Sequence, residues 1–225
     1  MPETREYPKI AIDGPAGAGK STVTREVSRR LKLKHLDTGA MYRAATLKFI
    51  RENADLSDLK NLEDILHRTE IKFDEKQNIF LDGENVTEEI RTAKVNEKVS
   101  PVSSISLVRR RLVEMQKDIA GKSQGIVMEG RDIASRVMPD AEFKFYLDAS
   151  LKERARRRMK EQLLKGIDLS EEEVIAEIKN RDQIDSKRED SPLTKVSDAI
   201  VIDTTNMDFE RVVDKIVSMV TERLR

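Results

Sequence analysis

Residues 14–21 have the types and the spacing of a loop that binds phosphate groups. They read Gly-Pro-Ala-Gly-Ala-Gly-Lys-Ser and match the pattern G-x-x-x-x-G-K-[ST] in full. Glycines let successive backbone N–H groups face an anion, and a helix that starts near Gly19 directs the positive end of its dipole at the same point. In this chemistry Lys20 attracts the β and γ phosphates and the Ser21 hydroxyl is a ligand for Mg²⁺. An ordinary glycine-rich turn is the alternative, which the apolar run before the loop and the amphipathic helix after it disfavour.

Two arginine-rich segments could bind further phosphate. Arg154, Arg157 and Arg158 share one face of a predicted helix and could hold a transferring phosphoryl group, although a solvated charged face is the other interpretation. Because the chain also has a phosphate loop, we favour binding of a phosphoryl group. Arg181, Asp185 and Arg188 are spaced i, i+4, i+7. They could bind a phosphate and a hydroxyl or form only surface ion pairs, and periodicity leaves both open.

Polar residues also stand where the elements of an open sheet end. Asp37-Thr38-Gly39 precedes a predicted helix at 40–52 and could simply cap it, while Arg43 lies one turn further and could reach the same anion. Gly130-Arg131-Asp132 follows a predicted strand at its carboxyl end, which is where ligands bind in open α/β sheets. We interpret His35 and His67 as structural.

The elements that must position these residues alternate along the chain. Short apolar runs at 10–12, 126–128, 143–147 and 199–202 predict strands, and amphipathic helices lie between them. This alternation predicts a parallel sheet with helices on both faces. Capping boxes, Ser150 with Glu153 and Ser170 with Glu173, predict two helix starts, and Asp208 is expected to cap the last helix.

Residues 71–81 depart from this alternation of strands and helices. The apolar runs 71–73 and 79–81 flank a polar turn and predict an antiparallel hairpin. We therefore predict an inserted subdomain at 60–100, a core domain at 1–59 and 101–225, and a lid at about 154–168, where a glycine-containing break separates two charged helices.

Composition limits the class of protein. The 225 residues include 42 Lys+Arg and 42 Asp+Glu, and a net charge of zero disfavours binding of a nucleic acid polymer. The absence of Cys excludes a disulfide scaffold and thiolate chemistry. No signal-peptide pattern or membrane-spanning run is present, so we expect a cytoplasmic protein that does not bind membranes. The sequence offers many arginines and no obvious catalytic base, which favours a phosphate acceptor over an alcohol, because a phosphate is already largely ionised at neutral pH.

Five segments together resemble the bacterial-type cytidylate kinases. They are the phosphate loop, Asp37-Thr38-Gly39-Ala40-Met41-Tyr42-Arg43, residues 82–87 with Glu89-Ile90-Arg91, Gly130-Arg131-Asp132, and Arg181 with Asp185 and Arg188. The similarity runs from about residue 9 to the C-terminus. It implies an α/β P-loop kinase with a five-stranded parallel sheet, a monophosphate-binding insert and a short lid. The implied reaction transfers the γ-phosphoryl group of ATP to CMP or dCMP with Mg²⁺ as cofactor, and we expect a monomer.

The resemblance also implies roles for individual residues. The ATP-binding set is Gly14, Pro15, Ala16, Gly17, Ala18, Gly19, Lys20, Ser21 and Thr22. The CMP-binding set is Asp37, Thr38, Arg43, Ser100, Arg109, Arg131, Asp132, Arg181, Asp185 and Arg188. Of these, Ser100, Arg109 and Asp132 match the positions that read cytosine, and Asp185 matches the carboxylate that contacts the ribose. The catalytic set is Lys20, Arg131, Arg154, Arg157, Arg158 and Arg188.

Three other interpretations remain. The first is a P-loop kinase for another small molecule, such as UMP, AMP, dTMP or shikimate, which the hairpin insert and Gly130-Arg131-Asp132 disfavour. The second is a nucleotide-dependent switch, which would not need a second arginine-lined anion site. The third is an RNA-binding module built on residues 154–158, which the zero net charge and the lack of interleaved aromatic residues disfavour.

Overall fold

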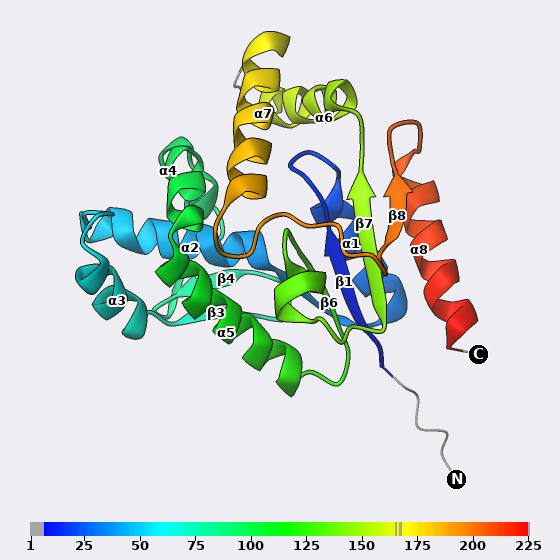
Figure 1. The fold of residues 1–225 in the computed structure, drawn as a ribbon, viewed down its shortest axis with the longest axis horizontal. Helices are drawn as coiled ribbons and strands as arrows, with labels where there is room; N and C mark the ends of the chain where they lie inside the picture. Colours follow the sequence, from blue (N-terminus) through cyan, green and yellow to red (C-terminus); the bar gives the residue numbers. More distant parts are fainter. Residues whose placement is uncertain (1–6, 165, 167, 225) are drawn as a thin grey trace. The chain divides into compact units, whose positions relative to one another are not determined.

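Strand β1 (Lys9–Asp13) is the central strand of a five-stranded sheet with the order β2-β6-β1-β7-β8 (Figure 1). The computed structural model describes residues 7–164, 166 and 168–224, so Lys165 and Ile167 of the predicted lid lie outside it. The other strands are β2 (Lys34–Asp37), β6 (Ile126–Gly130), β7 (Phe143–Asp148) and β8 (Ile200–Asp203). Ile10, Ala11 and Ile12 are fully buried, as expected for a parallel strand that is covered on both faces.

The register of the parallel strands brings two loops to one edge of this sheet. β1 pairs with β6 so that Asp13, the last residue before the phosphate loop, lies opposite Gly130, the residue before Arg131. β1 also pairs in parallel with β7, and β7 with β8. The phosphate loop after β1 and the segment after β6, which are more than a hundred residues apart in the chain, therefore begin side by side.

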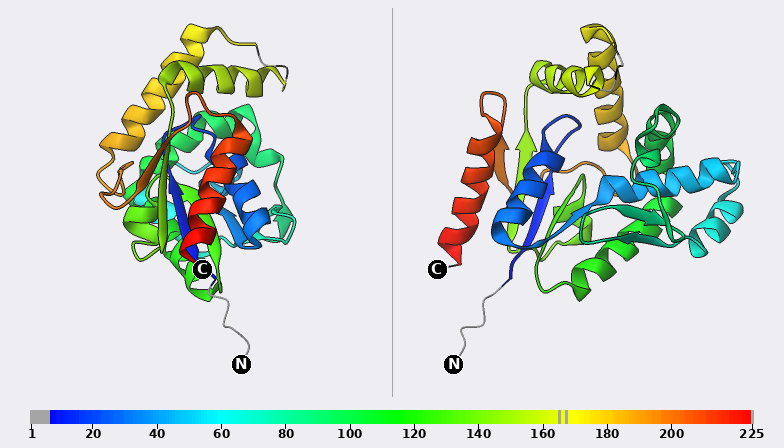
Figure 2. Two further views of the ribbon diagram at one scale, coloured as in Figure 1. Left: turned by 90° about the vertical axis from the view of Figure 1, so that its right-hand side faces the viewer. Right: turned by 180° about the vertical axis from the view of Figure 1, so that it is seen from behind.

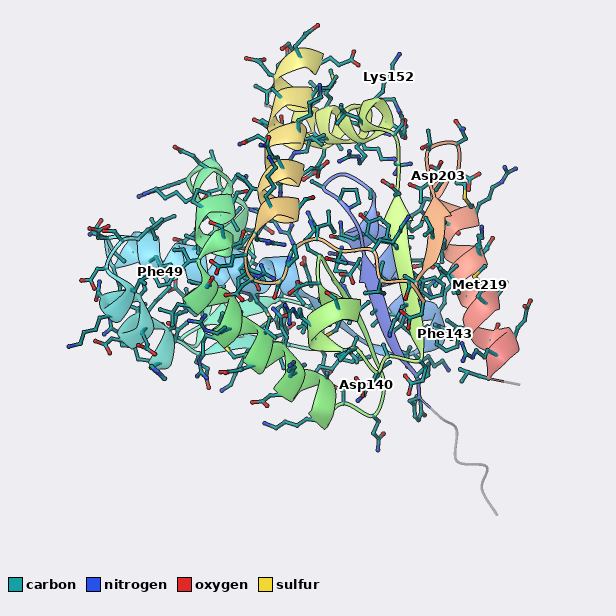
Figure 3. All side chains as sticks on the ribbon, in the orientation of Figure 1. Phe49, Asp140, Phe143, Lys152, Asp203 and Met219 are labelled. Carbon is teal, nitrogen blue, oxygen red and sulfur yellow. The ribbon has the colours of Figure 1, made fainter. Side chains whose placement is uncertain are left out.

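Two compact units make up the chain. The first consists of Met1–His35 with Ala120–Arg225, and the second of Leu36–Ile119. In the first unit α1 (Lys20–Leu31) packs against α8 (Phe209–Arg223), and Val27 and Val213 share a fully buried core with Phe145. Met219 of α8 and Phe143 of β7 lie in the same region (Figure 3).

The helices α6 (Leu151–Leu163) and α7 (Glu171–Lys187) pack against each other (Figure 2). Ala155, Val174 and Ile178 form a small core between them. Both capping residues occur as predicted, but only Ser170 with Glu173 forms a complete capping box. At α6 the Ser150 hydroxyl accepts from the Glu153 N–H, whereas the Glu153 carboxylate is held by Arg156 and Arg157. The capping box predicted there is therefore only half present, because stronger charged donors hold its glutamate.

The second unit contains the predicted hairpin. A three-stranded antiparallel sheet has the order β3 (Ile71–Phe73), β4 (Ile79–Leu81) and β5 (Glu84–Asn85). Around it are α2 (Thr38–Arg51), α3 (Leu59–His67), the 3₁₀ turn η1 (Glu89–Arg91), α4 (Ala93–Ser104) and α5 (Ser106–Lys122). Within this unit α2 packs against α3, α4 and β4. The insert at 60–100 stays a prediction.

Strand β2 was not predicted from the residue pattern. Its segment is polar, and only His35 and Leu36 in it are buried. In the part of the chain that the structure describes, no helix is long and apolar enough to cross a membrane.

Candidate active site

The phosphate loop connects β1 to α1, as its motif predicts. Gly19 caps α1 in the left-handed conformation with φ 86°. A Cβ atom at Gly14 would lie 2.0 Å from the carbonyl oxygen of Leu147, and one at Gly17, whose φ is 77°, would lie 3.0 Å from the Cβ of Arg154. These two positions require glycine because β7 and α6 approach the loop backbone so closely.

Lys20 is buried at the start of α1, and its ammonium donates to the carbonyl oxygen of Pro15 at 2.8 Å. Burial holds its pKa well below the usual value, and the charges of Arg131 and Arg181 act in the same direction. Glu129 and Asp13 act against this shift. Negative phosphates bound in the loop would favour the charged form of Lys20 in the same way as these carboxylates.

Ser21 contacts a carboxylate that the sequence analysis did not assign to the site. Its hydroxyl donates to Glu129 Oε2 at 2.6 Å, and His35 Nε2 lies 3.2 Å from Glu129 Oε1. Glu129 is 3% exposed and belongs to β6. The signal that could have indicated it is an acidic residue at the carboxyl end of a strand beside the one that leads into the phosphate loop.

A hydroxyl and a carboxylate this close are hard oxygen donors of the kind that Mg²⁺ prefers. The residues therefore fit the predicted cation, with Ser21 as ligand and Glu129 beside it. Among the described residues no group of three His, Cys, Asp or Glu could hold a metal ion. A Mg²⁺ ion bound at Ser21 would thus take its other ligands from phosphate oxygens and water, which is how Mg²⁺ binds in many kinases.

Asp185 and Arg188 of the predicted second anion site come together, and Arg131 joins them. Arg131 Nε donates to Asp185 Oδ2 at 2.8 Å, and Arg188 Nη1 lies 3.4 Å from Asp185 Oδ1. Asp185 is 4% exposed and Arg188 is 8% exposed, so they do not form a surface ion pair. Burial acts to raise the pKa of Asp185, but the charges of Arg131, Arg188 and Arg181 outweigh it and hold that pKa below its usual value. Arg188 follows the last residue of α7 in an extended conformation and so lies just beyond the helix.

Asp13 supports the segment that follows Arg131. Its carboxylate accepts from the N–H groups of Ile133 at 2.9 Å and Ala134 at 2.8 Å, at the start of a single π-helical turn, η2 (Ile133–Val137). Burial raises the pKa of Asp13 to about 6, with a smaller contribution from the charge of Asp132, although both hydrogen bonds act against the shift. Asp132 itself is buried.

The arginines of α6 contact the phosphate loop through its carbonyl groups. Arg154 Nη1 donates to the carbonyl oxygen of Ala16 at 3.1 Å and to Asp182 Oδ2 at 2.5 Å. Arg157 donates to the carbonyl oxygens of Ala18 at 3.3 Å and Thr204 at 2.7 Å. The clamp on a phosphoryl group, predicted for these residues together with Arg158, stays a prediction.

Arg158 is half-buried, and its Nη1 lies 3.1 Å from Glu161 Oε2 on the same helix. Its described ion pair is therefore local to α6, in contrast to the contacts of Arg154 and Arg157 with the loop.

Within the second unit, three of the predicted residues make separate contacts. Asp37 caps α2 by accepting from the N–H of Ala40 at 3.0 Å. Arg43 donates to Asn96 Oδ1 at 2.5 Å, which ties α2 to α4. The Arg109 guanidinium is 1% exposed, lies 5.0 Å from the centre of the Tyr42 ring and donates to the carbonyl oxygen of Ser103.

Two further predicted residues also lie on these helices. Thr38 is buried at the first position of α2, and Ser100 is half-buried within α4. Their part in ligand binding stays a prediction.

Comparison with known proteins places the sequence in a family. The family model described as "Cytidylate kinase" matches residues 10–222. The chain is 51% identical to a cytidylate kinase of Caldanaerobacter subterraneus subsp. tengcongensis, with 92% of each chain covered. It is 45% identical to a cytidylate kinase of Bacillus subtilis, with 96% of this chain and 97% of the relative covered.

Solved structures support the fold. A gluconokinase from Sinorhizobium meliloti 1021 matches 98% of this chain and 95% of its own with a TM-score of 0.51 at 10% identity. An uncharacterised protein from Eubacterium ventriosum gives a TM-score of 0.53 at 13% identity over 95% of this chain. The sequence matches cover nearly the whole length on both sides, and the chain therefore belongs to the cytidylate kinase family of nucleoside monophosphate kinases.

Proposed function

We propose that this enzyme transfers the γ-phosphoryl group of Mg·ATP to CMP or dCMP, giving ADP and CDP or dCDP. The observation that carries the proposal is the cluster in which the half-buried Arg131 and the buried Arg188 contact the buried Asp185, in the same unit as the phosphate loop. In this cluster Asp185 faces both Arg131 and Arg188. A phosphate bound beside these guanidinium groups would form further charge-assisted hydrogen bonds with them.

The donor side of the reaction follows from the loop. Its backbone N–H groups and the start of α1 bind the phosphates of ATP, and Lys20 adds a positive charge. When bound at Ser21, Mg²⁺ neutralises charge on the β and γ phosphates. Arg154 and Arg157 hold the loop through the carbonyl oxygens of Ala16 and Ala18, and the Ala16 N–H donates to Asp182 Oδ1 at 3.4 Å.

The acceptor side needs charge balance rather than a base. An oxygen of the CMP phosphate attacks the γ-phosphorus of ATP, and the bond from that phosphorus to the oxygen of ADP breaks. Because the acceptor phosphate is largely ionised at neutral pH, no proton has to be removed first. Arg131 and Arg188 are proposed to bind that phosphate, and Thr38 and Arg43 are proposed to contribute from the second unit.

The preference for cytosine is proposed to rest on Ser100, Arg109 and Asp132. A carboxylate such as Asp132 can accept from the exocyclic amine of cytosine, and a guanidinium such as Arg109 can donate to N3 or O2. Uracil reverses the donor pattern at N3 and O4, and it would leave buried polar groups without partners. We therefore expect UMP to be a poor substrate.

The direct test is ADP formation from Mg·ATP with CMP, dCMP, UMP, AMP, dTMP, shikimate or water as acceptor. The proposal expects strong turnover with CMP and dCMP, weak turnover with UMP and almost none with the others. Turnover with a different acceptor would keep phosphoryl transfer and overturn the roles of Ser100, Arg109 and Asp132. Slow ADP formation that does not depend on the acceptor would favour a nucleotide-dependent switch.

A further inference from the structure

We propose that His35 is a positioning residue for the magnesium-binding end of the phosphate loop, because it holds the Glu129 carboxylate in the orientation that engages the Ser21 hydroxyl. This inference rests on the proposed binding of Mg·ATP at Ser21. His35 was interpreted above as structural, and the contacts of Glu129 give it a more specific role.

The geometry uses both oxygens of one carboxylate. His35 Nε2 lies 3.2 Å from Glu129 Oε1, while Oε2 accepts from Ser21 at 2.6 Å. A carboxylate held at both oxygens cannot rotate about its terminal bond without losing one of these contacts. His35 is 4% exposed and Glu129 is 3% exposed, so water does not readily replace either partner.

The two side chains are carried by neighbouring strands. His35 belongs to β2 and Glu129 to β6, and these strands are adjacent in the sheet order. Sites built on sheet strands hold side chains more rigidly than sites on loops. The imidazole of His35 is therefore a rigidly held hydrogen-bond partner for the Glu129 carboxylate, which contacts Ser21 of the phosphate loop.

The tautomer of His35 follows from its partner. An ionised carboxylate only accepts hydrogen bonds, so Nε2 must carry the proton. Nδ1 has no hydrogen-bond partner within the described residues, in agreement with that assignment.

The contact between His35 and Glu129 affects metal binding through the orientation of the Ser21 hydroxyl. Because the Ser21 proton points at Glu129, the lone pairs of its oxygen are free to face a cation. Lys20 lies close enough for the charge of Glu129 to act on its pKa, and it would compete for a carboxylate oxygen released from His35. Loss of the His35 contact would thus weaken the ordering of Ser21. Partners that orient residues around metal sites typically change metal affinity by about 10–100-fold when they are removed.

The test compares His35→Leu, His35→Gln and the wild type by calorimetric titration with ATP, once in Mg²⁺ and once in EDTA. His35→Leu should weaken binding of Mg·ATP by about 10-fold and leave binding of metal-free ATP unchanged. His35→Gln, whose amide can donate at the position of Nε2, should restore most of the affinity. His67→Leu is the matched control, because His67 is exposed and lies 4.0 Å from Glu63 on α3.

A second arm separates positioning from a loss of fold. In a Ser21→Ala background, His35→Leu should produce no further loss of Mg·ATP affinity, because the two residues act through one carboxylate. Equal losses of Mg·ATP and metal-free ATP, no rescue by glutamine, or additive effects in the double variant would each overturn the proposal. Failure of the wild type to bind Mg·ATP would instead refute the proposed function.

Discussion

Individual buried residues with charges of both signs lie in the phosphate loop and near it. Lys20, Asp13 and Glu129 are each less than 10% exposed, and Asp185 and Arg188 lie equally deep. Burial of an isolated charge costs several kcal/mol, so each of these groups depends on its neighbours. The role of each group can therefore be tested by replacing one charged side chain and measuring the stability of the protein or its activity with a ligand.

Asp13 should give the stability of the protein a specific pH dependence. Its pKa is raised to about 6 in the folded protein, from 3.8 for a free carboxyl group. The folded state therefore binds a proton before the unfolded state does as the pH falls. The contribution of Asp13 is fully present below about pH 4 and is lost as the pH rises through 6.

The free energy of unfolding of the wild type, relative to that of Asp13→Asn, should consequently fall by about 2.5 kcal/mol between pH 4 and pH 7. Urea unfolding of both proteins across this range measures the difference, and the comparison cancels the titration of all other groups. A difference that stays constant with pH would show that Asp13 titrates normally.

Asp185 should distinguish the two acceptor nucleotides. If its carboxylate accepts from the ribose 2′-hydroxyl, Asp185→Ala should lower kcat/KM for CMP more than for dCMP. The preference for CMP over dCMP should change by about 10-fold, the value of one hydrogen bond to a charged group. Steady-state kinetics with both nucleotides measures the ratio, and an unchanged ratio would remove the ribose contact from the site.

At the level of elements, side chains of α6 and α7 form hydrogen bonds with the backbone of the phosphate loop. Arg154 of α6 joins three elements, because it donates to the carbonyl oxygen of Ala16 in the loop and to Asp182 of α7. Gly17 allows this approach, since a Cβ there would meet Arg154. The loop conformation therefore depends on residues more than a hundred positions further along the chain.

Arg154→Ala should destabilise the protein by about 2–3 kcal/mol and weaken ATP binding, because it removes the hydrogen bonds to the carbonyl oxygens of Ala16 and Ala149 and the ion pair with Asp182. Arg156→Ala is the control, since the Arg156 side chain is 69% exposed and its described ion pair is with Glu153 on the same helix. Such a surface pair contributes about 0–1 kcal/mol. Equal losses for the two variants in urea unfolding would contradict the supporting role of Arg154.

For the whole molecule, the two units carry different parts of the proposed chemistry. The phosphate loop, Glu129 and the Arg131–Asp185–Arg188 cluster belong to the first unit, and Arg43 and Arg109 belong to the second. The proposed CMP-binding residues are therefore divided between the units, whereas the proposed ATP-binding residues are not.

Amide hydrogen exchange should report this division. Mg·ATP alone should slow exchange mainly in peptides of residues 10–35 and 120–205, and CMP should additionally slow exchange in α2, α4 and α5. Shikimate serves as the control ligand and should protect none of these peptides. Protection by CMP that is confined to the first unit would exclude Arg43 and Arg109 from the acceptor site.

The local parts of this protein follow from its sequence alone. Residues 14–21 specify a phosphate loop because glycine conformation, the start of a helix and the Lys-Ser pair depend on neighbours in the chain. The hairpin at 71–81 and the four apolar strands were likewise predicted from short windows. Strand β2 was missed because its segment is polar and pairs in the sheet beside β6.

The contacts between distant residues were decided only by the tertiary structure. Arg131 meets Asp185 across 54 residues of sequence, Glu129 meets His35 across 94, and Ser21 meets Glu129 across 108. Such pairs depend on which strands are neighbours and in what register, and a single sequence specifies neither. The sequence by itself therefore predicted the phosphate loop and the helix that follows it, while the packing of the sheet decided which buried charges lie beside that loop.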